Sequence, residues 1–325
     1  RQKELELTIA LTNYCNFSCV YCYQNKNEKL MTTEVANMII EKIDRILNDN
    51  IFEGINIHYF GGEPLLNIPV LIYLDENIKK ITDKIGIVYK AFLTTNGSML
   101  SKELLQKVKF SSIQLTFDGL EKTHDRLRVS DHFHFKEEIE LIENIMNFSQ
   151  AKVLLRTNIC KENKDEIIAL HKYIFEKFGN ERIEINPNRT IKYHQDDSFE
   201  MLSVQEYAEV AYQIKLLWSE QKGKFELPVP RSTPCKFPYG NAYAISPEGY
   251  CTFCSGSMDQ EKKYFFDVDI ENKKMFSVRK ECKKCNILPL CLGGCIIQYN
   301  LRAGACTYEK YELKNILISY IKHIS

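Results

Sequence analysis

The chain has 325 residues, which is enough for one large domain or for a domain with an extension. Lys plus Arg and Asp plus Glu both number 43, so the formal net charge is zero, which argues against bulk electrostatic binding to nucleic acid or to an anionic membrane. No apolar run approaches the roughly 20 residues that cross a bilayer, so we expect neither nucleic acid nor a membrane as a partner.

The twelve cysteines are many for a chain whose N-terminus lacks the pattern of a secretory signal. We therefore expect a cytoplasmic protein whose cysteines bind metal or act in catalysis rather than form disulfides. The chain begins at Arg1 rather than Met, so we expect upstream sequence to be missing. Three cysteines lie at positions 15–22, Cys160 stands alone, and eight fall between Cys235 and Cys306, which indicates two metal-bearing regions.

Short β-rich runs alternate with helical periodicity from Glu4 to Asn186. The predicted strands are Leu5–Leu11, Ile55–Phe60, Ile87–Thr94, Ser112–Phe117, Lys152–Asn158 and Arg182–Asn186. The predicted helices between them are Thr33–Leu47, Ile68–Ile81, Lys102–Val108, Lys136–Phe148 and Lys164–Phe178. Such repeats imply right-handed crossovers and a parallel sheet. Because six units are fewer than the eight of a closed barrel, the sequence predicts an α/β fold with a partial (β/α)6 TIM-like barrel.

Candidate functional residues follow the predicted strands, where the site of such a barrel is expected. They are Cys15, the segments Gly61–Pro64 and Thr95–Gly97, and Asp118 with Gly119.

The rest of the chain divides into a linker and a cysteine-rich region. Val204–Trp218 is predicted as a linking helix, and four prolines between Leu227 and Pro238 mark a boundary. Thr307–Ile324 is predicted as a closing helix. We therefore expect a core at residues 1–200, a linking helix at 201–229 and a cysteine-rich extension at 230–325.

The first cysteines form the motif C-x3-C-x2-C over Cys15, Cys19 and Cys22. Three thiolates on one loop can hold three irons of a cubane iron–sulfur cluster and leave the fourth iron open for another ligand. Two other interpretations are a zinc site with a distant fourth ligand and loop cysteines without metal.

Four motifs in order resemble the radical S-adenosylmethionine (SAM) superfamily over about residues 5–190: C-N-F-S-C-V-Y-C-Y, F-G-G-E-P, T-T-N-G and T-F-D-G-x4-H-D. The resemblance implies that Cys15, Cys19 and Cys22 hold a [4Fe-4S] cluster whose open iron is chelated by SAM. One electron would then cleave SAM to methionine and a 5′-deoxyadenosyl radical that abstracts a substrate hydrogen. The cofactor would supply this chemistry, while the protein orients and shields it.

The segment Gly61–Pro64 resembles the family motif that binds the SAM amino group. The glycines Gly61 and Gly62 would let the backbone approach a ligand closely, and the Glu63 carboxylate or a carbonyl would suit an ammonium group. The alternative is a plain turn at the end of a strand.

Other SAM contacts follow from the same resemblance. Tyr21 corresponds to the aromatic residue beside adenine, and Thr116 and Asp118 stand where the family contacts the ribose or nearby groups. Arg128 matches an arginine near the SAM carboxylate, and Arg156 is a weaker candidate for that role, because an arginine fork suits a carboxylate. A solvated surface group is the alternative for Arg156.

Two further residues have structural interpretations. His124 could be purely structural, and the lone Cys160 is expected to be a core thiol rather than a ligand.

The second cysteine cluster contains C-x2-C-x5-C-x3-C from Cys282 to Cys295, which alone suggests zinc or an iron–sulfur cluster. Together with C-x13-G-x4-C before it and a last cysteine after it, the pattern resembles the SPASM domain, which carries up to two auxiliary [4Fe-4S] clusters. The resemblance implies two ligand sets, Cys235, Cys254 and Cys295 on auxiliary cluster I, and Cys282, Cys285, Cys291 and Cys306 on auxiliary cluster II. The expected total is three [4Fe-4S] clusters.

Auxiliary cluster I lacks an obvious fourth ligand. Some relatives have another cysteine where this chain has Asn241. Cys251 could be the fourth ligand, or it could be an ordinary half-buried thiol beside a cluster with an open iron that binds a substrate thiolate or another donor. We favour the open iron, because Cys251 is three residues from Cys254 on what should be one strand.

The resemblance implies a peptide substrate. Sulfatase maturases, which form formylglycine, carry Q-G-G-E-P and an Asp after the G-x4-C cysteine, whereas this chain has Phe60 and Ser255 there. We therefore expect a maturase of ribosomal peptides that forms a thioether or a carbon–carbon or carbon–oxygen crosslink. The expected partners are a precursor peptide, a reductase or flavodoxin-type electron donor, and a leader-peptide recognition module on missing sequence or on a separate protein.

A non-catalytic iron–sulfur electron carrier or scaffold is the competing class of protein. It explains the cysteines but has no need of the motifs at Gly61–Pro64 and Asp118–Arg128. A zinc-stabilised binding module explains still less.

Overall fold

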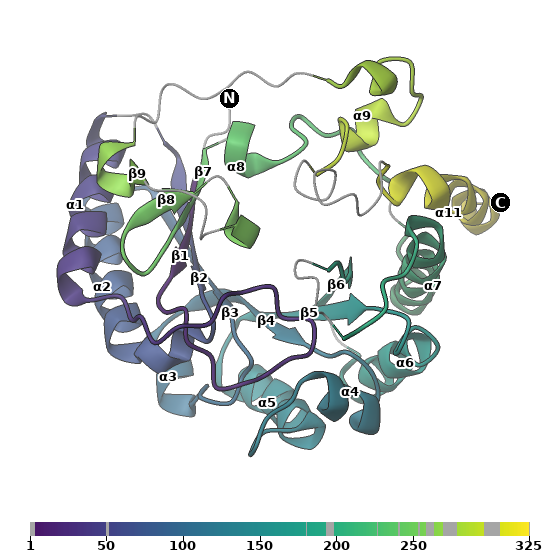
Figure 1. Ribbon diagram of the computed structural model, residues 1–325, viewed down its shortest axis with the longest axis horizontal. Coiled ribbons are helices and arrows are strands. Elements are labelled where there is room, and N and C mark those ends of the chain that lie inside the picture. The colour runs from purple at the N-terminus through teal and green to yellow at the C-terminus, as the bar shows by residue number, and fades with distance from the viewer. Residues whose placement is uncertain are drawn as a thin grey trace.

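The computed structural model describes residues 4–49, 52–179, 181–192, 198–225, 227–239, 241–252, 254–257, 263–268, 278–295 and 306–324. Over these residues the chain forms an α/β fold around a nine-stranded sheet with the order β6-β5-β4-β3-β2-β1-β7-β8-β9 (Figure 1). Figure 1 shows the sheet curving, with the helices along its outer side. The predicted fold class is confirmed.

Six parallel strands form the core of the sheet. They are β1 (Glu4–Ala10), β2 (Gly54–Phe60), β3 (Val88–Thr94), β4 (Phe110–Thr116), β5 (Lys152–Ile159) and β6 (Ile183–Arg189). All six predicted strands are present with shifted ends. The longest shift is in β6, which continues three residues past the predicted end at Asn186 and brings Asn188 and Arg189 to the mouth of the barrel.

Helices alternate with these strands. They are α1 (Thr33–Asp49), α2 (Ile68–Ile85), α3 (Lys102–Lys107), α4 (Glu121–Leu127), α5 (Phe135–Phe148) and α6 (Ile167–Phe178). Each of the five predicted helices is present, whereas α4 and the 3-10 helix η1 (Pro64–Asn67) were not predicted. In α1 the buried residues recur at helical spacing from Ala36 to Leu47, which is the pattern of a helix with one face on a core.

The two faces of the sheet differ in polarity, and this difference positions the site. In β2 the side chains of Ile55, Ile57 and Tyr59 are buried in the hydrophobic core, while His58 and Phe60 alternate with them and are half-buried. The strand β5 repeats this pattern, with Val153 and Leu155 in the core and Arg156 on the other face. The concave face therefore carries polar groups into the barrel.

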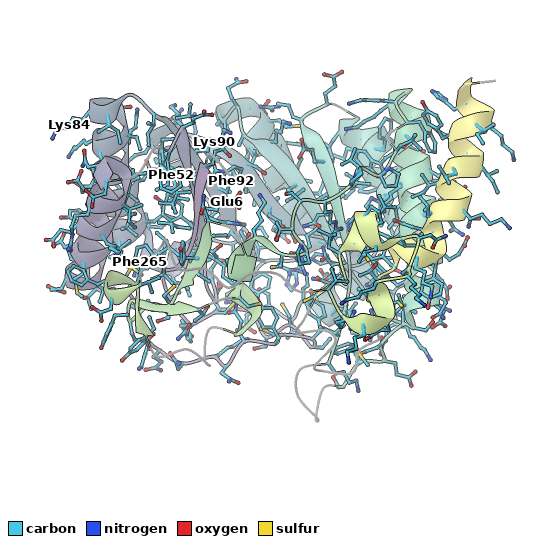
Figure 2. The ribbon with its side chains drawn as sticks, turned by 90° about the horizontal axis from the view of Figure 1, so that it is seen from above. Glu6, Phe52, Lys84, Lys90, Phe92 and Phe265 are labelled. Atoms are coloured by element: carbon cyan, nitrogen blue, oxygen red, sulfur yellow. The ribbon has the colours of Figure 1, made fainter. Side chains whose placement is uncertain are left out.

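The C-terminal part continues the same sheet. The strand β7 (Ala242–Ile245) pairs in parallel with β1, so that Glu6 lies opposite Ala242, and β8 (Tyr250–Thr252) and β9 (Lys263–Tyr264) follow antiparallel. The 3-10 helix η2 (Ser255–Ser257) comes after β8, and η3 (Phe265–Asp267) directly follows β9. Phe265, labelled in Figure 2, packs into the core beside Tyr243.

The helices α7 (Val204–Lys222) and α11 (Glu309–Ile324) lie beside α6 and β6, at the other end of the sheet from β9 (Figure 1). The linking helix α7 begins at a capping box of Ser203 and Glu206 and packs against α11, the predicted closing helix. The short elements α8 (Lys236–Tyr239), η4 (Lys280–Cys282) and α9 (Leu288–Cys291) belong to the cysteine-rich part. No helix in the described ranges combines the length and the apolar character needed to cross a membrane.

Candidate functional site

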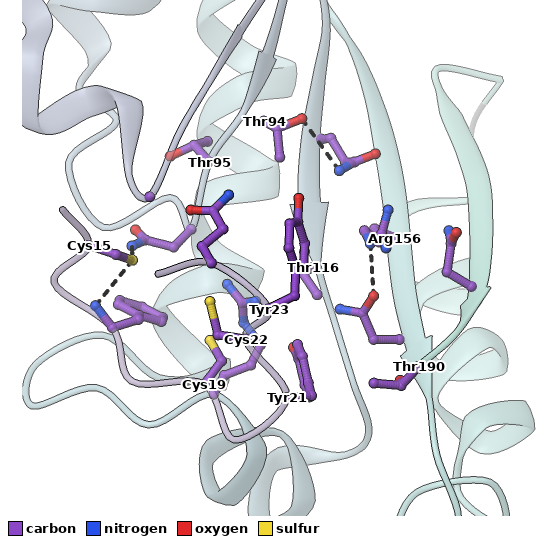
Figure 3. Close-up of a pocket in the computed structure, with 18 of the residues that line it drawn as sticks. Cys15, Cys19, Tyr21, Cys22, Tyr23, Thr94, Thr95, Thr116, Arg156 and Thr190 are labelled. Carbon is purple, nitrogen blue, oxygen red and sulfur yellow. Dashed lines mark hydrogen bonds between the residues drawn. The ribbon is translucent and has the colours of Figure 1, made fainter. Parts of the chain in front are cut away.

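The three cysteines after β1 line a pocket at the carboxyl ends of the parallel strands (Figure 3). This is the edge of the sheet where the sequence predicts the site. The cavity has a volume of about 310 Å³. Its lining comes from the loop after β1 and from β2 to β6: Cys15, Phe17, Cys19, Tyr21, Cys22, Tyr23, Gln24, Phe60, Gly61, Gly62, Thr94, Thr95, Asn96, Gln114, Thr116, Arg128, Arg156, Asn158, Asn188, Arg189, Thr190 and Ile191.

Backbone hydrogen bonds hold the cysteine loop in place. The amide of Ser18 donates to the carbonyl of Val129 at 2.8 Å, and the amide of Val20 donates to the carbonyl of Leu127 at 3.0 Å. The ring of Phe17 is buried beneath the loop. These bonds fix the cysteine loop to the end of α4 and to the segment that follows it, so the three thiols stay at one side of the pocket.

All three thiols are half-buried. Burial raises the pKa of Cys15 above its ordinary value and that of Cys19 to about 11. Because a metal binds the thiolate, loading of this site with iron releases protons.

The structure leaves no room for a side chain at Gly61 or Gly62. A Cβ atom on Gly61 would lie 2.3 Å from the carbonyl oxygen of Thr12, and one on Gly62 would lie 2.2 Å from that of Tyr14. Gly61 also has a φ of 138°, a conformation that favours glycine. The close approach that these glycines allow is therefore to the backbone of the cysteine loop, in addition to any ligand in the pocket.

The Glu63 carboxylate, which is predicted to suit the SAM amino group, is held by hydrogen bonds within the protein. Its side chain is fully buried and does not line the pocket. It accepts hydrogen bonds from the amide of Leu65 at 3.0 Å, the hydroxyl of Thr95 at 2.7 Å and the amide of Asn96 at 2.6 Å. Burial raises its pKa, although these bonds oppose the change. Glu63 thus ties the loop after β2 to the loop after β3, and the backbone of this motif is the part that faces the pocket.

Asp118 also lies behind the wall of the pocket rather than in it. One carboxylate oxygen accepts from the amide of Asn158 at 2.7 Å, and the other accepts from the hydroxyl of Tyr21. Its side chain is fully buried. Asp118 therefore positions Tyr21 and the backbone of Asn158, whereas Thr116 and Tyr21 line the pocket. The contact of Asp118 with the ribose or nearby groups stays a prediction. Burial and the neighbouring Asp118 raise the pKa of Tyr21 well above its ordinary value.

Arg128 is a buried cation on the cysteine side of the pocket. Its side chain is 6% exposed, its guanidinium carbon lies 5.4 Å from the centre of the Phe17 ring, and its Nε is buried without a hydrogen-bond partner. Burial alone lowers the pKa of Arg128, but Cys19, Tyr21 and other acidic neighbours outweigh it and raise the pKa. An orphaned, buried N–H beside three thiols fits an anionic group bound in this pocket.

Arg156 stands on the opposite wall, on β5, and is half-buried. In Figure 3 it lies across the pocket from Cys15, with Thr116 and Tyr23 between them. Its Nε donates to the amide oxygen of Asn158 at 2.8 Å. Arg156 is thus a residue of the pocket and not a solvated surface group.

The polar floor of the pocket was missed by the sequence analysis. A chain of hydrogen bonds crosses the barrel from β2 to β6: His58 Nε2 lies 2.7 Å from Thr94 Oγ1, Gln114 Nε2 donates to Thr94 at 3.4 Å, and Asn186 donates to Gln114 at 3.0 Å. The available signal was the alternation of polar residues within strands of a parallel sheet, because strands buried on both faces are otherwise continuously apolar.

The two structural interpretations agree with the geometry. His124 is buried between the rings of Phe117 and Phe135, with its Nε2 3.2 Å from a carboxylate oxygen of Glu138. Cys160 is fully buried, and its thiol donates to the Asn163 side chain at 3.6 Å. Burial raises the pKa of Cys160 to about 12, as expected for a core thiol.

Four C-terminal cysteines surround a second, small cavity. They are Cys282, Cys285, Cys291 and Cys306. Arg279 and Lys310 line the same cavity, and Lys310 Nζ lies 3.9 Å from the sulfur of Cys306. These four cysteines are the set that the resemblance assigned to auxiliary cluster II. Among the described residues, no group of three or more His, Cys, Asp or Glu side chains is arranged to hold a metal ion.

The other C-terminal cysteines are placed differently. Cys295 is exposed, whereas Cys235 and Cys254 are half-buried, and no described cavity is lined by all three. Cys251 is 3% exposed and belongs to the main hydrophobic core on β8. Its placement supports the interpretation of an ordinary buried thiol over that of a ligand.

Comparison with known proteins adds two sequence relatives. An uncharacterized protein of Methanocaldococcus jannaschii is 34% identical over 119 residues, which cover 35% of this chain and 39% of that protein. The radical SAM cyclopropyl synthase TigE of Paramaledivibacter caminithermalis is 24% identical over 357 residues, which cover 96% of this chain and 73% of that enzyme. The chain thus spans about two fifths of the first relative's length.

Two solved structures share the fold. The structure of anSMEcpe with bound AdoMet has a TM-score of 0.75 at 18% identity and covers 99% of this chain and 100% of its own. Streptococcus suis SuiB bound to the precursor peptide SuiA has a TM-score of 0.65 at 17% identity and covers 91% and 73%. At these identities the likeness shows the fold alone.

A family model settles the relationship. The model of the radical SAM superfamily matches residues 9–174, which is half of the chain and includes the three cysteines of the pocket, the glycine pair, Arg128 and Arg156. The chain belongs to the radical SAM superfamily.

Proposed function

We propose that this radical SAM protein modifies a peptide, forming a thioether or a carbon–carbon or carbon–oxygen crosslink in a ribosomally made precursor. Membership of the superfamily implies SAM and one [4Fe-4S] cluster. The observation that carries the proposal is the pocket itself, in which three thiols and the buried cation of Arg128 line one cavity at the carboxyl ends of the parallel strands.

The residues of the pocket fit this cofactor pair. Cys15, Cys19 and Cys22 would hold the cluster, and the backbone of Gly61 and Gly62 would meet the SAM amino group. When bound, cluster and SAM supply a 5′-deoxyadenosyl radical for hydrogen abstraction. Tyr21, held by Asp118, would form one side of the adenine site.

The chain's own residues hold the loops of this site together. Glu63 joins the loops after β2 and β3, the glycine pair joins them to the cysteine loop, and Phe17 fills the space beneath. Fixed loops around a shielded cavity suit a reactive intermediate, because water and misplaced donors would otherwise quench it.

The C-terminal cysteines would hold two auxiliary clusters. Cys282, Cys285, Cys291 and Cys306 share one cavity, which supports a common cluster. Cys235, Cys254 and Cys295 are proposed for the other, which would have an open iron because Cys251 lies in the core. We propose that these clusters accept the electron left after hydrogen abstraction, or bind substrate. A variant with Cys282 and Cys285 replaced by Ala that kept full product turnover would contradict this role.

The relatives support a peptide substrate. SuiB has been solved with a precursor peptide, anSMEcpe with a Cp18Cys peptide, and TigE is a cyclopropyl synthase. Formylglycine formation is the second candidate, favoured by the fold likeness to anSMEcpe, but Phe60 makes the pocket wall apolar where sulfatase maturases carry Gln, and Ser255 stands where they carry Asp.

The proposal includes the expected division into a core at residues 1–200, a linking helix at 201–229 and a SPASM-like part at 230–325. It also includes a cytoplasmic location, a flavodoxin-type or reductase electron donor and a leader-peptide recognition module.

The deciding experiment is anaerobic quantitation of iron and sulfide with Mössbauer spectroscopy, together with detection of 5′-deoxyadenosine after reduction in the presence of SAM. About twelve irons per chain, falling by about four in the variant with Cys15, Cys19 and Cys22 replaced by Ala, would support one core and two auxiliary clusters. About four irons with zinc present would contradict the auxiliary clusters. Loaded protein that never cleaves SAM would favour an electron carrier instead.

A further inference from the structure

The pocket carries more positive charge than SAM can use. Among the described residues it is lined by three arginines, Arg128, Arg156 and Arg189, and by no Asp or Glu side chain. The two acidic residues that the sequence analysis assigned to this site, Glu63 and Asp118, are fully buried and accept hydrogen bonds from the protein itself. A cavity of this kind favours anionic groups.

Arg128 would bind one anionic group. It lies on the cysteine side, where Cys19 and Tyr21 are its strongest acidic neighbours, and its unpartnered Nε is buried there. A single carboxylate, such as that of SAM on the adjacent cluster, would satisfy it.

Arg156 is left without a partner of opposite charge. Its Nε bond to Asn158 fixes the plane of the guanidinium, and its two terminal nitrogens make no hydrogen bond or ion pair with any residue that the structure describes. Its neighbours across the sheet are Thr116 on β4 and Asn186 on β6, which are both uncharged. A half-buried arginine fork held in this way is preorganised for a carboxylate with two oxygens.

Arg189 adds to the same wall. It extends β6 into the mouth of the pocket, and its Nη1 donates to the backbone carbonyl of Leu202 at 3.2 Å. This bond holds the Arg189 side chain in place. Its charge raises the positive potential beside Arg156.

The surrounding side chains suit a peptide. The amides of Gln114, Asn158 and Asn188 line the pocket next to Arg156, and amide groups can both donate to and accept from a peptide backbone. Resting on the proposed function, we infer that Arg156 binds a carboxylate of the peptide substrate, so that the residue presented to the radical lies next to an acidic side chain or to the peptide's C-terminus.

The test measures binding rather than turnover. Anaerobic, cluster-loaded enzyme with saturating SAM is titrated with N-acetyl-Gly-Glu-Gly-amide, with its Gln counterpart, and with N-acetyl-Gly-Gln-Gly carrying a free C-terminus. We expect a peptide with a carboxylate to bind about 10-fold more tightly than the neutral one. Preference for the Glu peptide identifies a side chain, and preference for the free acid identifies a C-terminus.

Variants assign the effect to Arg156. Arg156→Gln should abolish the preference while changing the SAM dissociation constant less than about 3-fold, whereas Arg128→Gln should weaken SAM about 10-fold. Arg156→Lys, which keeps the charge but loses the fork, should retain part of the preference. Arg126→Gln removes an exposed arginine outside the pocket and should change neither constant.

The outcomes separate the two proposals. Equal binding of all three peptides to the wild type, or a loss of SAM affinity in Arg156→Gln that Arg128→Gln does not show, overturns the inference and leaves the radical SAM function intact. Loaded wild type that fails to bind or cleave SAM overturns the proposed function itself.

Discussion

At the scale of single residues, the glycine pair shows how closely the loops of the site are packed. In Gly62→Ala the new methyl group would lie 2.2 Å from the carbonyl oxygen of Tyr14 and 2.9 Å from that of Asn13, and both contacts are with backbone that cannot rotate away. We expect this variant to lose about 3 kcal/mol of unfolding free energy and most of its core iron, as measured by urea unfolding and iron quantitation.

Gly86 is the matched control for that substitution. It ends α2 with a φ of 74°, and a Cβ there would meet nothing within 4 Å. Gly86→Ala should therefore cost only about 1 kcal/mol of backbone strain and leave the iron content unchanged. Similar losses in the two variants would mean that the approach of the glycine loop to the cysteine loop is not what requires Gly62.

At the scale of elements, the seam between α6 and α7 depends on one neutral histidine. Trp218 Nε1 donates to His171 Nδ1 at 3.0 Å, and because an indole only donates, the proton of His171 must lie on Nε2, which faces Thr157 Oγ1 at 3.2 Å. Burial lowers the pKa of His171 to about 3. In the unfolded chain a histidine titrates near pH 6.5.

This shift predicts a pH-dependent stability. Below about pH 6.5 the unfolded state binds a proton that the folded state excludes, so stability falls as the pH falls. His171→Gln keeps an acceptor for Trp218 and a donor for Thr157 but cannot titrate. Between pH 7 and pH 5 the wild type should lose about 2 kcal/mol more than the variant in urea unfolding. His58, whose pKa burial lowers to about 4, contributes equally to both proteins. Parallel stability curves for the two proteins would show that His171 is not neutral and buried in solution.

At the scale of the whole molecule, features with a local sequence pattern could be predicted from the sequence. Contacts between residues far apart in the chain could not. The apolar periodicity located the six strands, and the spacing of Cys282, Cys285 and Cys291 anticipated a shared cavity. No local signal indicated that residues 242–245 would pair with β1, more than 230 positions away. The inward orientation of Glu63 and Asp118 was likewise invisible, because their partners Asn96 and Asn158 lie on other strands or loops.

A partly buried ion pair joins α11 at the C-terminal end of the chain to the linking helix α7. Lys215 on α7 lies 2.6 Å from Glu312 on α11, whose carboxylate is almost fully buried, and α11 begins three residues after Cys306. Lys215→Met would leave this carboxylate buried without its cation. We expect α11 to exchange its amide hydrogens at least about 10-fold faster and the protein to lose about 2 kcal/mol at pH 8. Burial already raises the pKa of Glu312, so the uncompensated carboxylate becomes protonated as the pH falls, and the loss of stability should shrink at pH 5.5.

Lys79→Met, which breaks an exposed pair with Asp83, is the control and should cost less than about 0.5 kcal/mol at either pH. If the loss in Lys215→Met is the same at both pH values, the buried charge of Glu312 is not what joins α11 to α7.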